Sequence, residues 1–261
     1  MNTSDFRFMS QGRVVAPLRL EEAGLLAPVD IRGAGQGRAL LMLHGFSSSP
    51  AVFRVMLPQL KGYDALLCPV LPGHGDSIAV FAHTPASAWL SYVETLCGDL
   101  IETYEQVDVL GFSLGGLLAC HLSQRFKLNR LYLLAPALVI HLPLQLTRLL
   151  AYILRALGVR RLNNRAGNLY TTHYPELVYS QLPIATIIEM LTLIKDTPRI
   201  IPTCPVDLFL GRMDEVVDSQ AVADYFESNA RVKTHWLAHS AHILPLDGDI
   251  EAIVACINHQ E

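Results

Sequence analysis

Short apolar runs alternate with stretches of helical periodicity over the first half of the chain. The runs have the length and composition of strands buried on both faces: ALLMLHG (39–45), DALLCPV (64–70), VDVLG (107–111) and NRLYLLAPAL (129–138). Apolar residues recur at helical spacing between them, in 49–60, in 85–104 and after Ser113. Strands that alternate with helices predict a doubly wound, mostly parallel α/β sheet.

The alternation breaks between residues 139 and 202, where two or three helical segments are expected with no strand between them. It resumes with strands in 204–215 and 231–238, a helix over 219–228 and a closing helix that ends near Ile257. Residues 13–31, with Pro17, Gly24 and Pro28, favour edge strands or a hairpin. We therefore expect a core domain of 1–138 and 203–261, with 139–202 inserted before the penultimate strand as a helical lid (cap).

The segment GFSLGG places Ser113 between two glycines, where a predicted strand meets a predicted helix. A serine on such a sharp turn is held in a strained conformation, with its hydroxyl above the sheet. Side chains at positions 111 and 115 would collide with the neighbouring strand and helix, which explains both glycines. A serine that only caps the helix would not require glycine on both sides. The pattern predicts a nucleophile.

A nucleophilic serine needs a base, and the base needs a carboxylate to orient it. Asp214 follows the strand VDLFLG, and His242 follows the strand RVKTHWLA, so both are expected at the same end of the sheet as Ser113. The order Ser, Asp, His is that of α/β-hydrolases. The alternatives are His239 and His235 as the base, with Glu215 and Asp218 as neighbouring carboxylates; we favour His242 over His239 and expect Asp218 to cap a helix.

Acyl transfer also needs N–H donors for the oxyanion that forms in the transition state. One is expected from the backbone of Leu114, the residue after the nucleophile. The other is expected from Phe46, in the loop that follows the strand ALLMLHG, where Gly45 lets the main chain approach the substrate. The Phe46 side chain would then form one wall of the pocket.

The motifs LLMLHGF, LPGHGDS, GFSLGG, GRMDEVVD and HSAHILPLD occur in this order over most of the chain. The chain thus resembles cap-bearing α/β-hydrolases of the carboxylesterase and monoacylglycerol-lipase type. The resemblance implies a cofactor-free serine hydrolase of carboxylic esters with Ser113, Asp214 and His242 as the triad and Phe46 and Leu114 as oxyanion donors. It implies a structural role for the motif LPGHGDS. The stretch before residue 40 and the lid match no motif of the family closely.

Composition limits the classes of partner. A net charge of −4 and a pI near 6.2 give no reason to expect nucleic acid. Five scattered cysteines form no C-x-x-C pair, so we expect reduced thiols and no metal ligation. No signal-peptide pattern and no apolar run of membrane-spanning length occurs, which favours a cytoplasmic location.

The lid combines many leucines with five arginines and no acidic residue between positions 139 and 174. An apolar lid favours a small-molecule ester with an apolar acyl group: a short- to medium-chain ester or a monoacylglycerol. A basic amphipathic helix can also rest weakly on an anionic membrane, attract an anionic substrate, or form a solvated face. The same triad would serve a thioesterase or an amide or lactone hydrolase, and a non-catalytic ligand binder is a further alternative.

Overall fold

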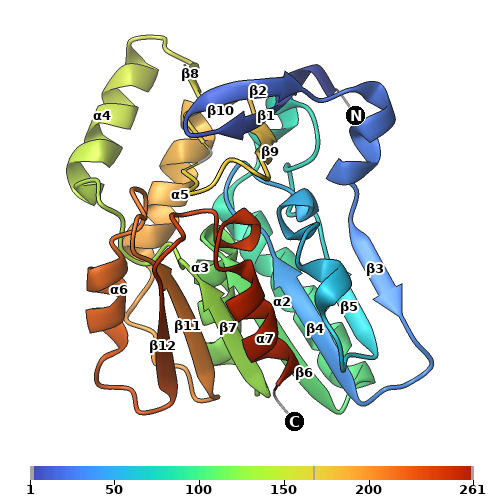
Figure 1. Ribbon diagram of the computed structural model, residues 1–261. Helices are drawn as coiled ribbons and strands as arrows, with labels where there is room; N and C mark the ends of the chain where they lie inside the picture. The colour runs from blue at the N-terminus through green and yellow to red at the C-terminus, as the bar shows by residue number, and fades with distance from the viewer. Residues whose placement is uncertain (1–2, 167, 260–261) are drawn as a thin grey trace.

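The computed structural model describes residues 3–166 and 168–259 and is built around a seven-stranded sheet (Figure 1). From one edge to the other the strands are β12 (Val232–Leu237), β11 (Val206–Gly211), β7 (Arg130–Leu134), β6 (Gln106–Phe112), β4 (Arg38–Leu43), β5 (Ala65–Cys68) and β3 (Val29–Arg32). All neighbours are parallel except β3, which runs antiparallel to β5 at the edge. The prediction of a mostly parallel sheet is confirmed.

Two apolar cores lie on opposite faces of this sheet because side chains alternate along each strand. In β4, Leu41 and Leu43 point into one core, whereas Leu40 and Met42 point into the other. The first core is covered by α2 (Ala86–Thr103), α3 (Leu114–Arg125) and α6 (Ser219–Phe226). The second is covered by α7 (Ile250–Asn258) and by three short 3-10 turns, η3 (Pro50–Phe53), η4 (Leu57–Gln59) and η5 (Leu244–Leu246).

The helix expected over residues 49–60 is wrong as a single element, since η3 and η4 occupy this stretch instead. Pro58 has no N–H to donate, and its ring would clash with the carbonyl four residues earlier in an α-helix. The apolar pattern survives in the turns, where Phe53 and Met56 are fully buried. Periodicity identified the buried residues here but not the type of helix.

The amino-terminal part and the 139–202 insertion share a second, smaller sheet (Figure 1). β1 (Phe6–Ser10) forms a hairpin with β2 (Arg13–Pro17) and pairs on its other side with β9 (Glu176–Tyr179) of the insertion. The insertion also contains β8 (Arg161–Asn163) paired with β10 (Gln181–Pro183), together with α4 (Leu144–Ala156) and α5 (Ile184–Asp196).

The expectation that the insertion holds only helices is therefore wrong for residues 161–163, 176–179 and 181–183, which are strands. Val178 and Tyr179 are β-branched and aromatic residues that favour strand, and both are completely buried. Pro183 is the N-cap of α5. The remaining short elements are η1 (Thr3–Asp5), η2 (Leu20–Leu26) and α1 (Ile78–Phe81). Among the described residues, no helix has the length and apolarity that a membrane span requires.

Candidate active site

Ser113 lies at the turn between β6 and α3 with φ 53° and ψ −113°, a left-handed conformation that costs a non-glycine residue energy. Added Cβ atoms would collide with the Gly115 carbonyl at position 111 and with the Leu43 carbonyl at position 115. The flanking glycines therefore allow strand and helix to approach each other. The Ser113 hydroxyl caps no N–H of α3. A capping role thus does not explain this residue.

A hydrogen-bonded chain joins the three side chains that the sequence predicted to meet. Ser113 Oγ lies 3.1 Å from His242 Nε2, and His242 Nδ1 lies 2.9 Å from Asp214 Oδ2. Because an ionised carboxylate only accepts, Nδ1–H donates to Asp214 and leaves Nε2 free to accept from Ser113. All three residues are at least nine-tenths buried. The arrangement can remove a proton from Ser113.

Backbone groups hold both partners of the serine in place. Asp214 Oδ1 accepts hydrogen bonds from the N–H groups of Val216 and Val217, at 2.8 and 2.9 Å. The main-chain N–H of His242 donates to the carbonyl of Asn168 at 3.0 Å. The Asn168 side-chain oxygen accepts from the N–H of Glu215 at 2.9 Å, which ties the Asp214 loop to the His242 loop.

The electrostatics of the histidine follow from burial and from its acidic neighbours. Burial by itself would lower the pKa of His242, but the charge and hydrogen bond of Asp214 outweigh it, and the Glu176 charge acts in the same direction. The pKa of His242 is therefore raised above its ordinary value. A raised pKa makes the imidazole a stronger base for the proton of Ser113.

The competing residues lie elsewhere. His239 is largely exposed and faces Asp249, and His235 contacts Asp207 within the sheet. Asp218 accepts a hydrogen bond from the N–H of Ala221 at 3.0 Å, so the prediction that it caps α6 is confirmed. Glu215 is exposed.

The loop after β4 is pressed against the serine turn. A Cβ at Gly45 would lie 2.9 Å from the Phe112 ring and 3.4 Å from Ser113 Cβ. Leu114 is the first residue of α3, so its N–H has no partner inside the helix. Phe46 follows Gly45 and lines the cavity beside Ser113. Both expected oxyanion donors are thus in segments adjoining the serine.

His44 fixes this loop, a role that the sequence analysis did not assign. Its Nε2 accepts from the N–H of Leu71 at 3.0 Å, and Nδ1 donates to the Gly45 carbonyl at 2.9 Å. Complete burial lowers the pKa of His44 to about 4, so the ring stays neutral and keeps one fixed tautomer. The signal was its position directly before Gly45 and Phe46, in the loop expected to supply an oxyanion donor.

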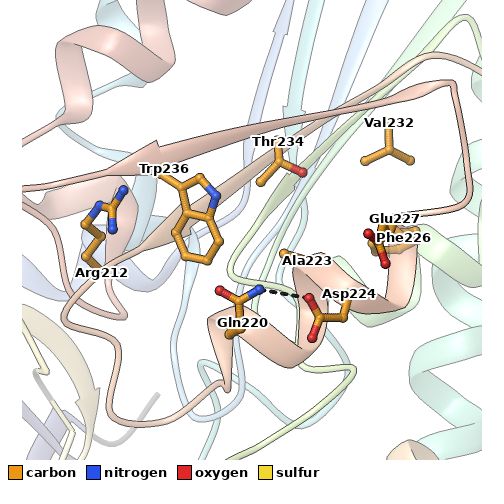
Figure 2. A pocket seen from close by; sticks show the side chains of 9 residues that line it. All are labelled: Arg212, Gln220, Ala223, Asp224, Phe226, Glu227, Val232, Thr234 and Trp236. Atoms are coloured by element: carbon orange, nitrogen blue, oxygen red, sulfur yellow. Dashed lines mark hydrogen bonds between the residues drawn. The ribbon is translucent and has the colours of Figure 1, made fainter.

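A cavity of about 380 Å³ opens beside Ser113 and His242. Most of its wall is apolar, from Phe46, Phe112, Leu142, Leu182, Met190, Val216 and Ile243. A second hollow, of about 450 Å³, lies between α6 and β12 and has a mainly polar wall that includes Arg212, Asp224 and Glu227 (Figure 2). None of the triad residues lines that hollow, so the apolar cavity is the candidate site for substrate.

Glu176 is one of the cavity residues that the sequence analysis did not assign. It begins β9, is only 3% exposed, and brings a carboxylate into a mainly apolar wall. Its charge raises the pKa of Arg54, although burial of that guanidinium lowers the pKa overall. In the sequence, Glu176 is a single acidic residue in a segment expected to be helical, and nothing near it indicates that it lines a cavity.

A parallel sheet of this order, with a strained serine turn at the carboxyl end of a central strand, defines the α/β-hydrolase class of fold. Residues 40–255 match the alpha/beta hydrolase family, and the chain belongs to that family. A thermostable monoacylglycerol lipase of Bacillus sp. (strain H-257) is 26% identical over 230 residues, which cover 82% of this chain and 86% of the relative.

Solved structures agree on the fold. One is reported among the metagenome-derived lipolytic enzymes LipS and LipT; it is 24% identical, has a TM-score of 0.75, and the match covers 88% of this chain and 95% of that one. The monoacylglycerol lipase of Paleococcus ferrophilus is 15% identical with a TM-score of 0.66, over 90% and 99% of the two chains.

Proposed function

We propose that this protein is a serine hydrolase that cleaves carboxylic esters through an acyl-enzyme. Ser113 Oγ attacks the ester carbonyl while His242 Nε2 takes its proton, and Asp214 stabilises the imidazolium. The N–H groups of Leu114 and Phe46 stabilise the oxyanion, each by about 3–4 kcal/mol. The imidazolium then protonates the leaving alcohol, and water attacks the acyl-enzyme by the reverse sequence. Side chains, backbone N–H groups and water suffice for these steps.

The observation that carries this proposal is the hydrogen-bonded chain from Ser113 through His242 to Asp214 at the wall of an apolar cavity. The test is hydrolysis of p-nitrophenyl esters from acetate to palmitate, with Ser113→Ala as the control. We expect a peak at one acyl length and loss of activity in the variant. If both proteins are inactive on every ester, ester hydrolysis is refuted, and thioester and lactone substrates decide whether another acyl group is cleaved.

For the substrate, we propose short- to medium-chain esters or monoacylglycerols. The apolar wall suits an acyl chain, and a cavity of this volume suits a small ligand. Glu176 adds an acceptor for a hydroxyl of the leaving alcohol, and the similarity to a monoacylglycerol lipase supports the same class. A series of monoacylglycerols and matched methyl esters tests this: Glu176→Leu, which removes the acceptor, should lower kcat/KM for the glycerol esters more than for the methyl esters.

We further propose that residues 139–202 act as the lid and that α4 rests on an anionic membrane surface. Large apolar side chains of α4 are about half exposed: Leu146, Leu149, Leu150 and Ile153, with Leu157 beyond its end 75% exposed. Arg155, Arg160 and Arg161 line one cleft beside this helix. Apolar side chains beside cations suit insertion among anionic headgroups.

Sedimentation with phosphatidylglycerol and phosphatidylcholine vesicles tests the contact. Binding should favour the anionic vesicles, weaken as salt rises, and fall in the double variant Leu149→Ser/Leu157→Ser. The matched control is Val14→Ser/Val15→Ser, which removes two exposed apolar residues of β2. Salt-insensitive binding, or equal loss in both variants, would refute the contact.

A further inference from the structure

Three side chains with metal-binding atoms converge on the face of the sheet that α7 covers. Asp207 belongs to β11, His235 to β12 and Cys256 to α7. One ligand atom of each, a carboxylate oxygen, an imidazole nitrogen and the thiol sulfur, lies within 4.8 Å of the other two. Within the described residues this is the one such group found. It contains no residue of the Ser113 site.

The same imidazole nitrogen faces both neighbours. His235 Nε2 lies 2.8 Å from Asp207 Oδ1 and 4.0 Å from Cys256 Sγ. Phe209 stacks on the imidazole, with ring centroids 4.6 Å apart and an angle of 15° between the planes, which holds the ring in this orientation. Asp207 is 2% exposed, and its other oxygen accepts from Arg130 at 2.8 Å.

This geometry does not suit activation of the thiol. In a nucleophile–histidine–carboxylate chain, one imidazole nitrogen accepts the proton while the other donates to the carboxylate. Here Nε2–H donates to Asp207, so the nitrogen nearest Cys256 has no lone pair for the thiol proton. The three atoms instead lie within 4.8 Å of one another, close enough for one metal ion to contact all three.

We propose that Asp207 Oδ1, His235 Nε2 and Cys256 Sγ bind a zinc ion, with water as the fourth ligand. Zinc accepts this mixture of oxygen, nitrogen and sulfur in a tetrahedral arrangement, whereas calcium and magnesium prefer oxygen alone. Ligand bonds of roughly 2.0–2.3 Å require only that Cys256 move closer and that Asp207 and His235 part slightly.

Zinc binding displaces the protons from the two ligand atoms that carry them, the thiol sulfur and the imidazole nitrogen. The thiol proton leaves to solvent as sulfur binds, and the imidazole proton moves from Nε2 to Nδ1 so that Nε2 can bind. Arg130 keeps its hydrogen bond to Asp207 Oδ2 and orients the carboxylate, as outer partners of metal ligands do.

The bound ion would connect the closing helix to the two strands that precede the Asp214 and His242 loops. We therefore expect zinc to stabilise the packing of α7 on β11 and β12 and to take no part in the reaction at Ser113. An ion that binds only the folded protein, present at a hundred times its Kd, is expected to raise Tm by roughly 5 °C.

The test uses untagged, chelator-treated protein titrated with Zn²⁺ in a calorimeter and with Co²⁺ in an absorption spectrometer. We expect one tight site per chain, a thiolate-to-cobalt charge-transfer band, and a higher Tm with zinc. Cys256→Ser should remove the charge-transfer band, and His235→Gln should weaken binding at least tenfold. Gln keeps a side-chain amide near Asp207, so the fold is retained, which the Tm without metal checks.

Matched controls separate this cluster from other thiols and histidines. Cys204→Ala removes a buried cysteine outside the cluster, and His239→Gln removes an exposed histidine that also faces a carboxylate, Asp249. Both should bind zinc as the unchanged protein does. The proposal is overturned if the unchanged protein binds no zinc, or if binding is the same in Cys256→Ser and His235→Gln as in the controls. Ester hydrolysis is measured separately, so failure here leaves the Ser113 proposal intact.

Discussion

Two aspartate–histidine pairs occupy the same two strands of this protein and their following loops. Asp207 and His235 lie within β11 and β12, whereas Asp214 and His242 lie beyond the carboxyl ends of those strands. Each pair is separated by 28 residues, and each member of the first pair precedes its counterpart by seven. The two pairs have identical spacing in the sequence, but their imidazole rings contact their partners through different nitrogen atoms.

The difference is the number of imidazole nitrogens that make contacts. His242 contacts Asp214 through Nδ1 and Ser113 through Nε2, so Nε2 can accept the serine proton while Nδ1–H stays hydrogen-bonded to Asp214. His235 turns Nε2 toward both Asp207 and Cys256. An aspartate near a histidine therefore says little about chemistry until the third group and the nitrogen facing it are known.

The largest effect is expected from Ser113→Ala. Removal of the nucleophile should lower kcat for ester hydrolysis by on the order of 10⁶ while the fold is retained. The corresponding change at the other pair, Cys256→Ala, should leave kcat and KM unchanged. Steady-state kinetics of both variants check this. Residual activity of Ser113→Ala near that of the unchanged protein would mean that another group attacks the ester.

The second comparison exchanges the two aspartates for asparagine. Asp214→Asn should lower kcat about 10⁴-fold, because the amide favours the wrong imidazole tautomer. Asp207→Asn should retain most of the activity but lose about 3 kcal/mol of unfolding free energy, because it removes the buried negative charge that pairs with Arg130. Kinetics and denaturant unfolding of both variants check this. Equal loss of activity in the two variants would show that the pairs do not act separately.

The contrast between the pairs also shows what the sequence can predict. Ser113, Asp214 and His242 each follow a predicted strand, and the carboxyl ends of parallel strands meet at one edge, so their convergence was predictable. Asp207 and His235 lie inside strands, and Cys256 comes from a helix whose packing depends on the whole second core. Local spacing does not contain that information, so the sequence analysis singled out no metal site there.

The insertion shows the same limit in the fold. The apolar period of α4 and α5 was enough to predict helices, because period is a local property. β9 was missed because its partner, β1, lies about 170 residues away in the chain. Glu176 reaches the cavity only as a consequence of that pairing, so neither the strand nor the carboxylate was predictable from the neighbouring residues.

A smaller effect is expected from Asn168, which joins the Asp214 loop to the His242 loop. Asn168→Ala removes the side-chain oxygen that accepts from the N–H of Glu215 and His242. Misplacement of the imidazole should lower kcat roughly 10- to 100-fold with little change in KM. Asn168→Asp keeps an acceptor oxygen and should recover most of the rate. As a matched control, Asn163→Ala changes an exposed asparagine of β8. If kcat falls equally in Asn168→Ala and Asn168→Asp, the cause is a folding defect and not the missing acceptor oxygen.

The smallest effect is a shift in the pH profile when Glu176 is changed to Gln. In the proposed mechanism His242 must be neutral, so kcat/KM should fall as pH decreases through the raised pKa of that histidine, with a midpoint above the ordinary 6.5. Glu176 contributes negative charge that favours the imidazolium, so its removal should move the midpoint to lower pH. The exposed carboxylate of Glu215 is screened by water, and Glu215→Gln should leave the midpoint in place. A midpoint that stays fixed in Glu176→Gln would mean that Asp214 alone sets the basicity of His242.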